Sequence, residues 1–123
     1  MITYSLEDSG IFYVRFSDSV SAEDIKKYLS DFAKINDLPL DFLSLYDLRD
    51  ANLTIVAEDV ASISNLANKI VSSFRTVRTA FLVNKPDITA YSILFKNSAS
   101  KGIAREVFST REAAINWLTN MRV

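Results

Sequence analysis

Three charged residues within four positions carry the strongest chemical signal in this sequence. Asp47, Arg49 and Asp50 follow directly after the apolar run Phe42–Tyr46, which is typical of a buried strand. Two carboxylates beside a guanidinium are suited to proton transfer or anion binding. Ligands of open α/β sheets gather at the carboxyl ends of strands, so this is the predicted position of a site. The alternative is a solvated loop in which an Asp–Arg pair contributes at most about 1 kcal/mol.

Several side chains that catalysis and cofactor binding commonly use are absent from the sequence. It has no cysteine and no histidine, which excludes disulfides, thiolate nucleophiles and a Ser-His-Asp triad. The two glycines, Gly10 and Gly102, are too far apart to form a glycine-rich nucleotide or phosphate loop. We therefore expect no cofactor, no metal site and no enzymatic activity. The alternative is a small enzyme or anion-binding protein that uses Asp47, Arg49 and Asp50.

Length and composition predict one domain that spans residues 1–123. Of the 123 residues 49% are hydrophobic and 24% are charged, which is enough apolar surface for a core and typical of a globular chain. The formal net charge of -1 gives no field that attracts a polyanion, so we expect no nucleic-acid partner. No apolar run approaches the roughly 20 residues of a membrane-spanning helix, and the first residues do not resemble a signal peptide. We expect a cytoplasmic protein.

The apolar periodicity predicts the elements that must position these charges. Two β-rich runs, Ile2–Leu6 and Ile11–Ser17, flank turn-forming residues and predict a hairpin. An amphipathic pattern from Ala22 to Phe32 predicts a helix, with Ser21 as its N-cap. Strands and helices alternate after it, and the later strands are expected at 42–46, 79–83 and 106–108. The order β-β-α-β-α-β-α-β-α predicts an α/β fold with a mixed, mainly parallel sheet and about four helices.

Hydroxyl and acidic side chains mark the predicted starts of the later helices. Thr54 is available to cap the second helix, and Asp87 is predicted to cap the third. Ser109 and Glu112 have the spacing of a capping box for the fourth helix. The apolar face of that last helix, which includes Met121, is expected to turn toward the core.

The C-terminal segment carries a recognisable pattern. It reads Arg105-Glu-Val-Phe-Ser-Thr-Arg-Glu-Ala-Ala-Ile-Asn-Trp-Leu118 and combines a strand, a Phe, a capped helix and an Ala-x-x-Trp-Leu motif. Together with the element order and with Asp47-Leu48-Arg49-Asp50, this segment resembles the SpoIIAA-like branch of the STAS superfamily. The resemblance implies a SpoIIAA-like (STAS-type) fold and a non-enzymatic binding or regulatory role.

The sequence departs from the superfamily at the position of its regulatory serine. In anti-sigma-factor antagonists of the superfamily, the strand-end Asp-Leu is followed by an Asp-Ser-Ser-Gly-like segment whose serine is phosphorylated. Ile55-Val-Ala-Glu58 stands in that place here. Thr54 is the nearest hydroxyl, and capping the second helix is its simpler role, so we do not expect it to be a phosphoacceptor.

The SpoIIAA-like branch also resembles the lipid-binding CRAL-TRIO fold, which implies a groove for an apolar ligand between sheet and helices. The aromatics that such a groove would use are Phe12, Phe16, Tyr28, Phe32, Tyr46, Phe74, Phe81, Tyr91 and Phe95. Aromatics at strand and helix spacing usually fill a core, and we favour that interpretation.

These observations predict a binding or regulatory module that takes a protein partner or a small apolar ligand. A homodimeric assembly domain is a further alternative. The residues predicted to contact the ligand or partner are Asp47, Arg49, Asp50, Tyr46, Phe81 and Tyr91.

Overall fold

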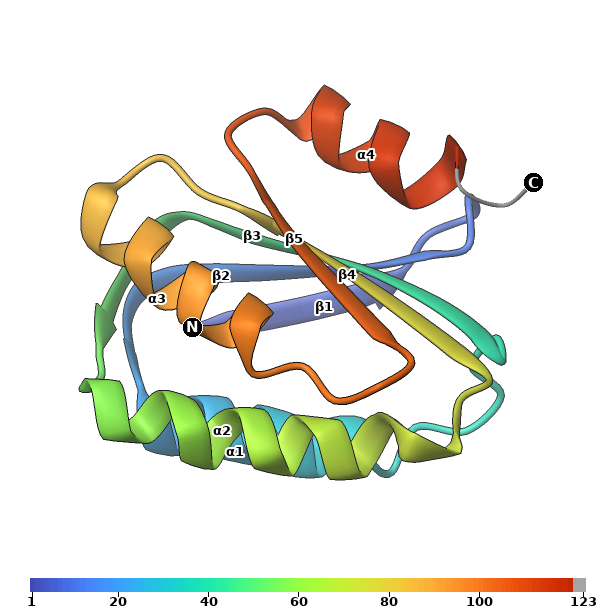
Figure 1. The fold of residues 1–123 in the computed structure, drawn as a ribbon, viewed down its shortest axis with the longest axis horizontal. Helices are drawn as coiled ribbons and strands as arrows, with labels where there is room; N and C mark the ends of the chain where they lie inside the picture. Colours follow the sequence, from blue (N-terminus) through green and yellow to red (C-terminus); the bar gives the residue numbers. More distant parts are fainter. Residues whose placement is uncertain (121–123) are drawn as a thin grey trace.

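A computed structural model describes residues 1–120, which form a five-stranded sheet with helices on both faces (Figure 1). The strands are β1 (Ile2–Leu6), β2 (Ile11–Ser21), β3 (Asp41–Thr54), β4 (Thr76–Leu82) and β5 (Ile103–Phe108). They lie side by side in sequence order, with β1 antiparallel to β2 and every later pair parallel. The predicted mixed, mainly parallel sheet with an N-terminal hairpin is confirmed.

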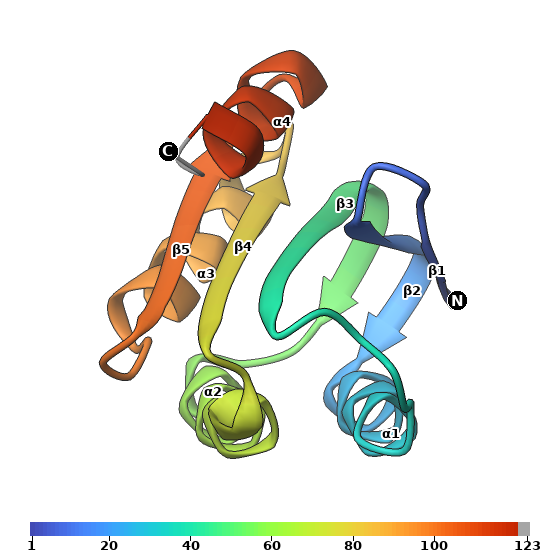
Figure 2. The ribbon, with the colours of Figure 1, turned by 90° about the vertical axis from the view of Figure 1, so that its right-hand side faces the viewer.

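The helices divide between the two faces of the sheet. They are α1 (Ala22–Phe32), α2 (Ala57–Ile70), α3 (Pro86–Asn97) and α4 (Arg111–Asn120), and a short 3-10 turn, η1 (Val71–Ser73), follows α2. Helices α1, α2 and α3 cover one face, whereas α4 packs on the opposite face (Figure 2). Among residues 1–120, no helix is long and apolar enough to cross a membrane.

The start of α1 agrees with its sequence signal. The Ser21 hydroxyl accepts a hydrogen bond from the Asp24 backbone N–H at 3.1 Å, and the Asp24 carboxylate accepts one from the Ser21 N–H at 3.0 Å. This reciprocal arrangement satisfies two N–H groups that have no partner inside the helix. The helix then buries one face against the sheet, formed by Ala22, Ile25, Tyr28, Leu29 and Phe32.

The residues predicted to cap α2 and α3 do not cap these helices. Thr54 does not cap α2, because β3 continues through it and its hydroxyl donates to the Val20 carbonyl. The first turn of α2 is instead closed by Asp59, whose carboxylate accepts from the Val56 N–H at 2.9 Å. Lys85 occupies the N-cap position of α3, so Asp87 lies inside the first turn.

The cap of α4 is shifted by one residue from the predicted position. The Thr110 hydroxyl, rather than that of Ser109, accepts a hydrogen bond from the Ala113 N–H at 3.2 Å. Either hydroxyl has the right chemistry, and the point at which β5 ends decides between them. Met121, which was predicted to face the core, lies outside the described residues.

The third strand is much longer than its apolar core predicts. It runs for 14 residues and pairs in parallel with β2 as far as Thr54 opposite Ser21. Asp47 and Arg49 therefore lie inside β3 and not in a loop after it, which corrects the predicted strand end at Tyr46. A register shift opposite Arg15 and Ser17 places one extra residue in β3 here, as a β-bulge does.

The sheet separates two apolar layers. The larger one lies between the sheet and helices α1 to α3, and the smaller one lies between the sheet and α4. Successive side chains of a strand point to opposite faces, so neighbouring residues join different layers. Tyr46 packs with the larger layer, whereas Leu45 belongs to the smaller one.

Candidate functional site

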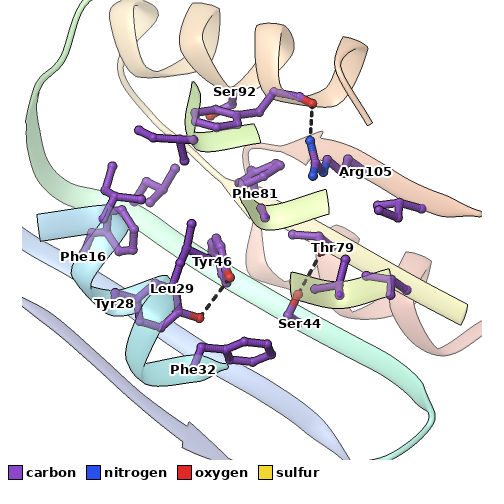
Figure 3. Close-up of a pocket in the computed structure, with 18 of the residues that line it drawn as sticks. Phe16, Tyr28, Leu29, Phe32, Ser44, Tyr46, Thr79, Phe81, Ser92 and Arg105 are labelled. Atoms are coloured by element: carbon purple, nitrogen blue, oxygen red, sulfur yellow. Dashed lines mark hydrogen bonds between the residues drawn. The ribbon is translucent and has the colours of Figure 1, made fainter. Parts of the chain in front are cut away.

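A cavity of about 80 Å³ lies inside the larger apolar layer, between the sheet and helices α1, α2 and α3 (Figure 3). Protein interiors are packed as densely as organic crystals and hold few voids larger than a water molecule, so this cavity is a distinct feature. Its wall consists of Phe16, Ile25, Tyr28, Leu29, Phe32, Phe42, Ser44, Tyr46, Leu48, Leu53, Ile63, Ala67, Val71, Val77, Thr79, Phe81, Tyr91, Ser92, Phe95, Ile103 and Arg105. None of the described residues that form the wall carries a carboxylate.

Aromatic rings from both the sheet and the helices form much of the wall. Tyr46, on the central strand, meets Phe81 edge-on at 5.7 Å between ring centroids and lies 6.1 Å from Phe16. Tyr28 approaches the same ring of Tyr46 from α1, at 6.1 Å. All nine predicted aromatic residues belong to the larger core cluster, as the favoured interpretation predicts, and seven of them, all except Phe12 and Phe74, also line the cavity.

Two pairs of hydroxyl groups supply polar points on this apolar wall. The Tyr28 and Tyr46 hydroxyls lie 3.0 Å apart, and Ser44 Oγ lies 3.0 Å from Thr79 Oγ1, as the dashed lines in Figure 3 mark. Burial raises the pKa of both Tyr28 and Tyr46, because a phenolate would lose its hydration. Both tyrosines therefore stay neutral and can donate a hydrogen bond.

Within residues 1–120, Arg105 is the one charged residue in the wall of the cavity, and only 8% of its surface is exposed. Its Nη1 donates to Ser64 Oγ at 2.9 Å and to the Phe95 carbonyl at 2.7 Å, and its Nη2 donates to Asn68 Oδ1 at 2.7 Å. All three acceptors are neutral. Burial lowers the pKa of Arg105, yet a guanidinium does not lose its proton in proteins, so a positive charge remains beside the cavity.

Sequence reasoning named Arg105 only as the first residue of a family motif and missed this role. Ile103, Arg105 and Val107 alternate along β5 and face the same apolar layer, with an arginine where an apolar residue is expected. A charged residue at an inward position of a strand is the signal that would have indicated it.

A second polar cluster lies on the opposite face of the sheet, around Asp47. The Asp47 carboxylate accepts hydrogen bonds from Arg49 Nε at 3.0 Å, from Arg49 Nη2 at 2.9 Å and from the Tyr13 hydroxyl at 2.8 Å. Burial raises the pKa of Asp47, but the hydrogen bonds from Arg49 and Tyr13 outweigh it and hold this pKa below its usual range. Asp47 is therefore a paired anion and a weak base. Asp50 pairs with Arg15 at 2.8 Å, where both side chains are exposed.

Two solved structures resemble this architecture over almost its whole length. One is an uncharacterised protein of the DUF3478 family with a SpoIIAA-like fold from Shewanella loihica PV-4, with a TM-score of 0.62 and 13% identity over 96% of this chain and 92% of that one. The other is the anti-sigma factor antagonist SpoIIAA in its unphosphorylated form, with a TM-score of 0.58 and 9% identity over 95% and 96%. The fold is SpoIIAA-like.

This likeness confirms the predicted fold class and extends to the fold alone, because both identities are low. No protein-family model and no curated protein matches the chain. The implied relation to the CRAL-TRIO branch stays a prediction. So does the interpretation of Ile55–Glu58, which spans the link from β3 to α2 and the first two residues of α2, as the place of the regulatory serine.

The SpoIIAA-like fold divides the predicted contact residues into two groups. Tyr46, Phe81 and Tyr91 line the cavity together, and the Tyr91 hydroxyl donates to the Ile55 carbonyl at 2.9 Å. The other group, formed by Asp47, Arg49 and Asp50, lies on the face that α4 partly covers. The two groups do not form one site, because side chains at successive positions of β3 point away from each other.

Proposed function

We propose that this chain is a non-enzymatic binding module that holds a small, mainly apolar ligand between its sheet and helices α1, α2 and α3. The observation that carries the proposal is the cavity of about 80 Å³, with a wall that is almost entirely apolar. A ligand there would exchange water for hydrocarbon contacts, which is worth roughly 25 cal/mol per Å² of apolar surface removed from water.

The polar groups support binding rather than catalysis. A general acid or base works best when its pKa lies near the operating pH. The shifts here run the other way, because burial raises the pKa of Tyr28 and Tyr46 further, and the hydrogen bonds from Arg49 and Tyr13 keep the pKa of Asp47 low. Each of these groups is suited to a fixed hydrogen bond and poorly suited to moving a proton.

The volume of the cavity limits the size of the ligand. An engineered apolar cavity of about 150 Å³ binds benzene or xenon, and this one has roughly half that volume. A single atom of xenon or a short aliphatic chain would fit with small shifts of the wall, whereas a long lipid would require helices α1 to α3 to move outward.

Xenon binding followed by NMR tests the proposal. Dissolved xenon should cause saturable shifts of backbone amides that surround the cavity, including those of Tyr46 and Phe81. Ala67→Leu adds carbons to the cavity wall on α2 and should abolish these shifts. Ala61→Leu makes the same change on the exposed side of α2 and is the matched control.

The same NMR titration with small organic molecules that carry a short apolar chain, such as butyramide and isobutanol, extends the test beyond xenon. Binding that Ala67→Leu removes and Ala61→Leu preserves supports a ligand-binding role. If neither xenon nor any small apolar molecule shifts the amides around the cavity, the proposed function is wrong.

A second candidate function is the binding of a protein partner. The observation that favours it is Val56, which is 57% exposed directly after β3, beside the first turn of α2. Crosslinking in cell extract should yield a specific adduct that Val56→Asp removes. Leu40→Asp, at a residue that is 60% exposed and lies just before β3, is the control. Light scattering at several concentrations distinguishes a second copy of this chain from another partner.

A further inference from the structure

The positive charge of Arg105 beside the cavity has no negative partner among residues 1–120. The ion pairs among residues 1–120 join Arg15, Arg49, Arg75 and Lys96 to carboxylates, and none includes Arg105. No acidic residue of the described part of the chain belongs to the wall of the cavity. A buried charge is normally paired, because the loss of its hydration is expensive and neutral hydrogen bonds offset only part of the cost.

The hydrogen bonds of Arg105 also leave donors available. A guanidinium has five N–H donors, and the bonds to Ser64, Phe95 and Asn68 use three of them. Within residues 1–120, Nε of Arg105 has no hydrogen-bond acceptor. The corresponding donors of another arginine, Nε and Nη2 of Arg49, show what such an edge can bind. They donate hydrogen bonds to the Asp47 carboxylate at 3.0 and 2.9 Å.

We infer that the ligand of the cavity is a short apolar carboxylate whose negative charge binds Arg105. The inference rests on the proposed function and identifies the class of its ligand. One cation balances one negative charge, so a monocarboxylate matches the site better than a dianion such as phosphate. The apolar chain would then lie against Tyr46 and Phe81, and the small volume restricts it to a few carbons.

The roles of the other polar groups follow from this arrangement. Ser64, Asn68 and the Phe95 carbonyl hold the guanidinium in place from α2 and α3, so Arg105 is preorganised before a ligand arrives. Figure 3 shows Arg105 at the edge of the cavity near Ser92, on the opposite side from Tyr28 and Phe32. An anionic head at Arg105 would therefore direct the apolar chain toward the aromatic side chains of α1 and β3.

A comparison of butyrate with butyramide in the wild-type protein tests the inference. The two molecules have nearly the same shape, and only butyrate is charged near neutral pH. Titrations followed by amide shifts should show butyrate binding at least tenfold more tightly. Butylammonium, which carries the opposite charge, should not bind measurably.

Variants of the arginine locate the source of that preference. Arg105→Lys keeps the positive charge but loses the planar guanidinium that can donate two parallel hydrogen bonds. It should still prefer butyrate to butyramide, by a smaller factor. Arg105→Met should bind butyrate and butyramide equally. Arg75→Met removes an exposed arginine that pairs with Asp41 outside the cavity, and it should leave the preference unchanged. Circular dichroism confirms that each variant is folded.

The outcomes separate the carboxylate inference at Arg105 from the proposed apolar binding function. Equal affinity for butyrate and butyramide in the wild type overturns the carboxylate inference and leaves the apolar binding function intact. A preference that persists in folded Arg105→Met overturns the role of Arg105. Binding of xenon without binding of butyrate or its branched isomers also overturns the inference, whereas failure of xenon as well overturns the proposed function. If Arg105→Met does not fold, the wild-type comparison and Arg105→Lys decide.

Discussion

Asp47 is bound by Arg49, its neighbour two positions along the same strand, through two hydrogen bonds of 3.0 and 2.9 Å. The two side chains meet because residues at i and i+2 of a strand share a face. Tyr13 adds a third bond from β2 at 2.8 Å, so the carboxylate also ties two strands together. Asp47 and Arg49, which the sequence predicts as contact residues of a site, thus also take part in the hydrogen bonding that joins β2 and β3.

Replacement of Asp47 should destabilise the fold. Asp47→Asn removes the charge that Arg49 and Tyr13 contact, and we expect a loss of about 1–3 kcal/mol in the free energy of unfolding. Urea denaturation measures this loss. Asp50→Asn breaks an exposed pair with Arg15 and should cost less than about 1 kcal/mol. Equal effects of the two changes would contradict the structural role assigned to Asp47.

Stability should decrease in acid because paired carboxylates must take up protons. The hydrogen bonds from Arg75 and Thr76 lower the pKa of Asp41 to about 2, and the pKa of Asp47 is also below its usual range. An unfolded Asp has a pKa of about 3.9, so the stabilisation is complete above that pH and is lost as the pH falls toward 2. Thermal melts between pH 6 and 2 should show the decrease. Asp41→Asn should make it less steep, and an unchanged slope would contradict the assignment.

The Tyr28–Tyr46 pair should behave as a coupled unit. Tyr28→Phe or Tyr46→Phe alone leaves one buried hydroxyl without its 3.0 Å partner and should cost about 1–3 kcal/mol. The double change removes both hydroxyls and should cost clearly less than the sum of the single changes. A double-mutant cycle from chemical denaturation measures the coupling. Additive costs would mean that the two hydroxyls do not depend on each other.

Enlarging the cavity should both weaken the fold and widen its ligand range. Leu29 is 5% exposed and lines the cavity, so Leu29→Ala should cost about 2–5 kcal/mol and allow benzene to bind. Leu118→Ala removes a fully buried leucine from the smaller core under α4 and should cost a similar amount. Only the first variant should show benzene-induced shifts of amides around Tyr46. Shifts at the same amides in Leu118→Ala would contradict the position of the cavity.

Local sequence signals were sufficient where the structure depends on neighbouring residues. The Ser21 N-cap, the hairpin around Gly10 and the order of strands and helices could all be predicted, because each depends on contacts within a few positions. The same local reasoning failed for the end of β3. The charged residues after Tyr46 look like a loop, but parallel pairing with β2 satisfies their backbone groups and keeps the strand extended to Thr54.

The sequence by itself determined that this is one α/β chain with a mixed sheet, few catalytic side chains and many inward-facing aromatics. Only the tertiary structure decided that the aromatics leave a cavity and that Arg105 borders it with no carboxylate from residues 1–120 in the wall. The physical reason is the distance along the chain. Arg105 is 41 residues from Ser64 and 37 from Asn68, and they meet around one guanidinium because α2 folds onto the sheet face that Arg105 of β5 also faces.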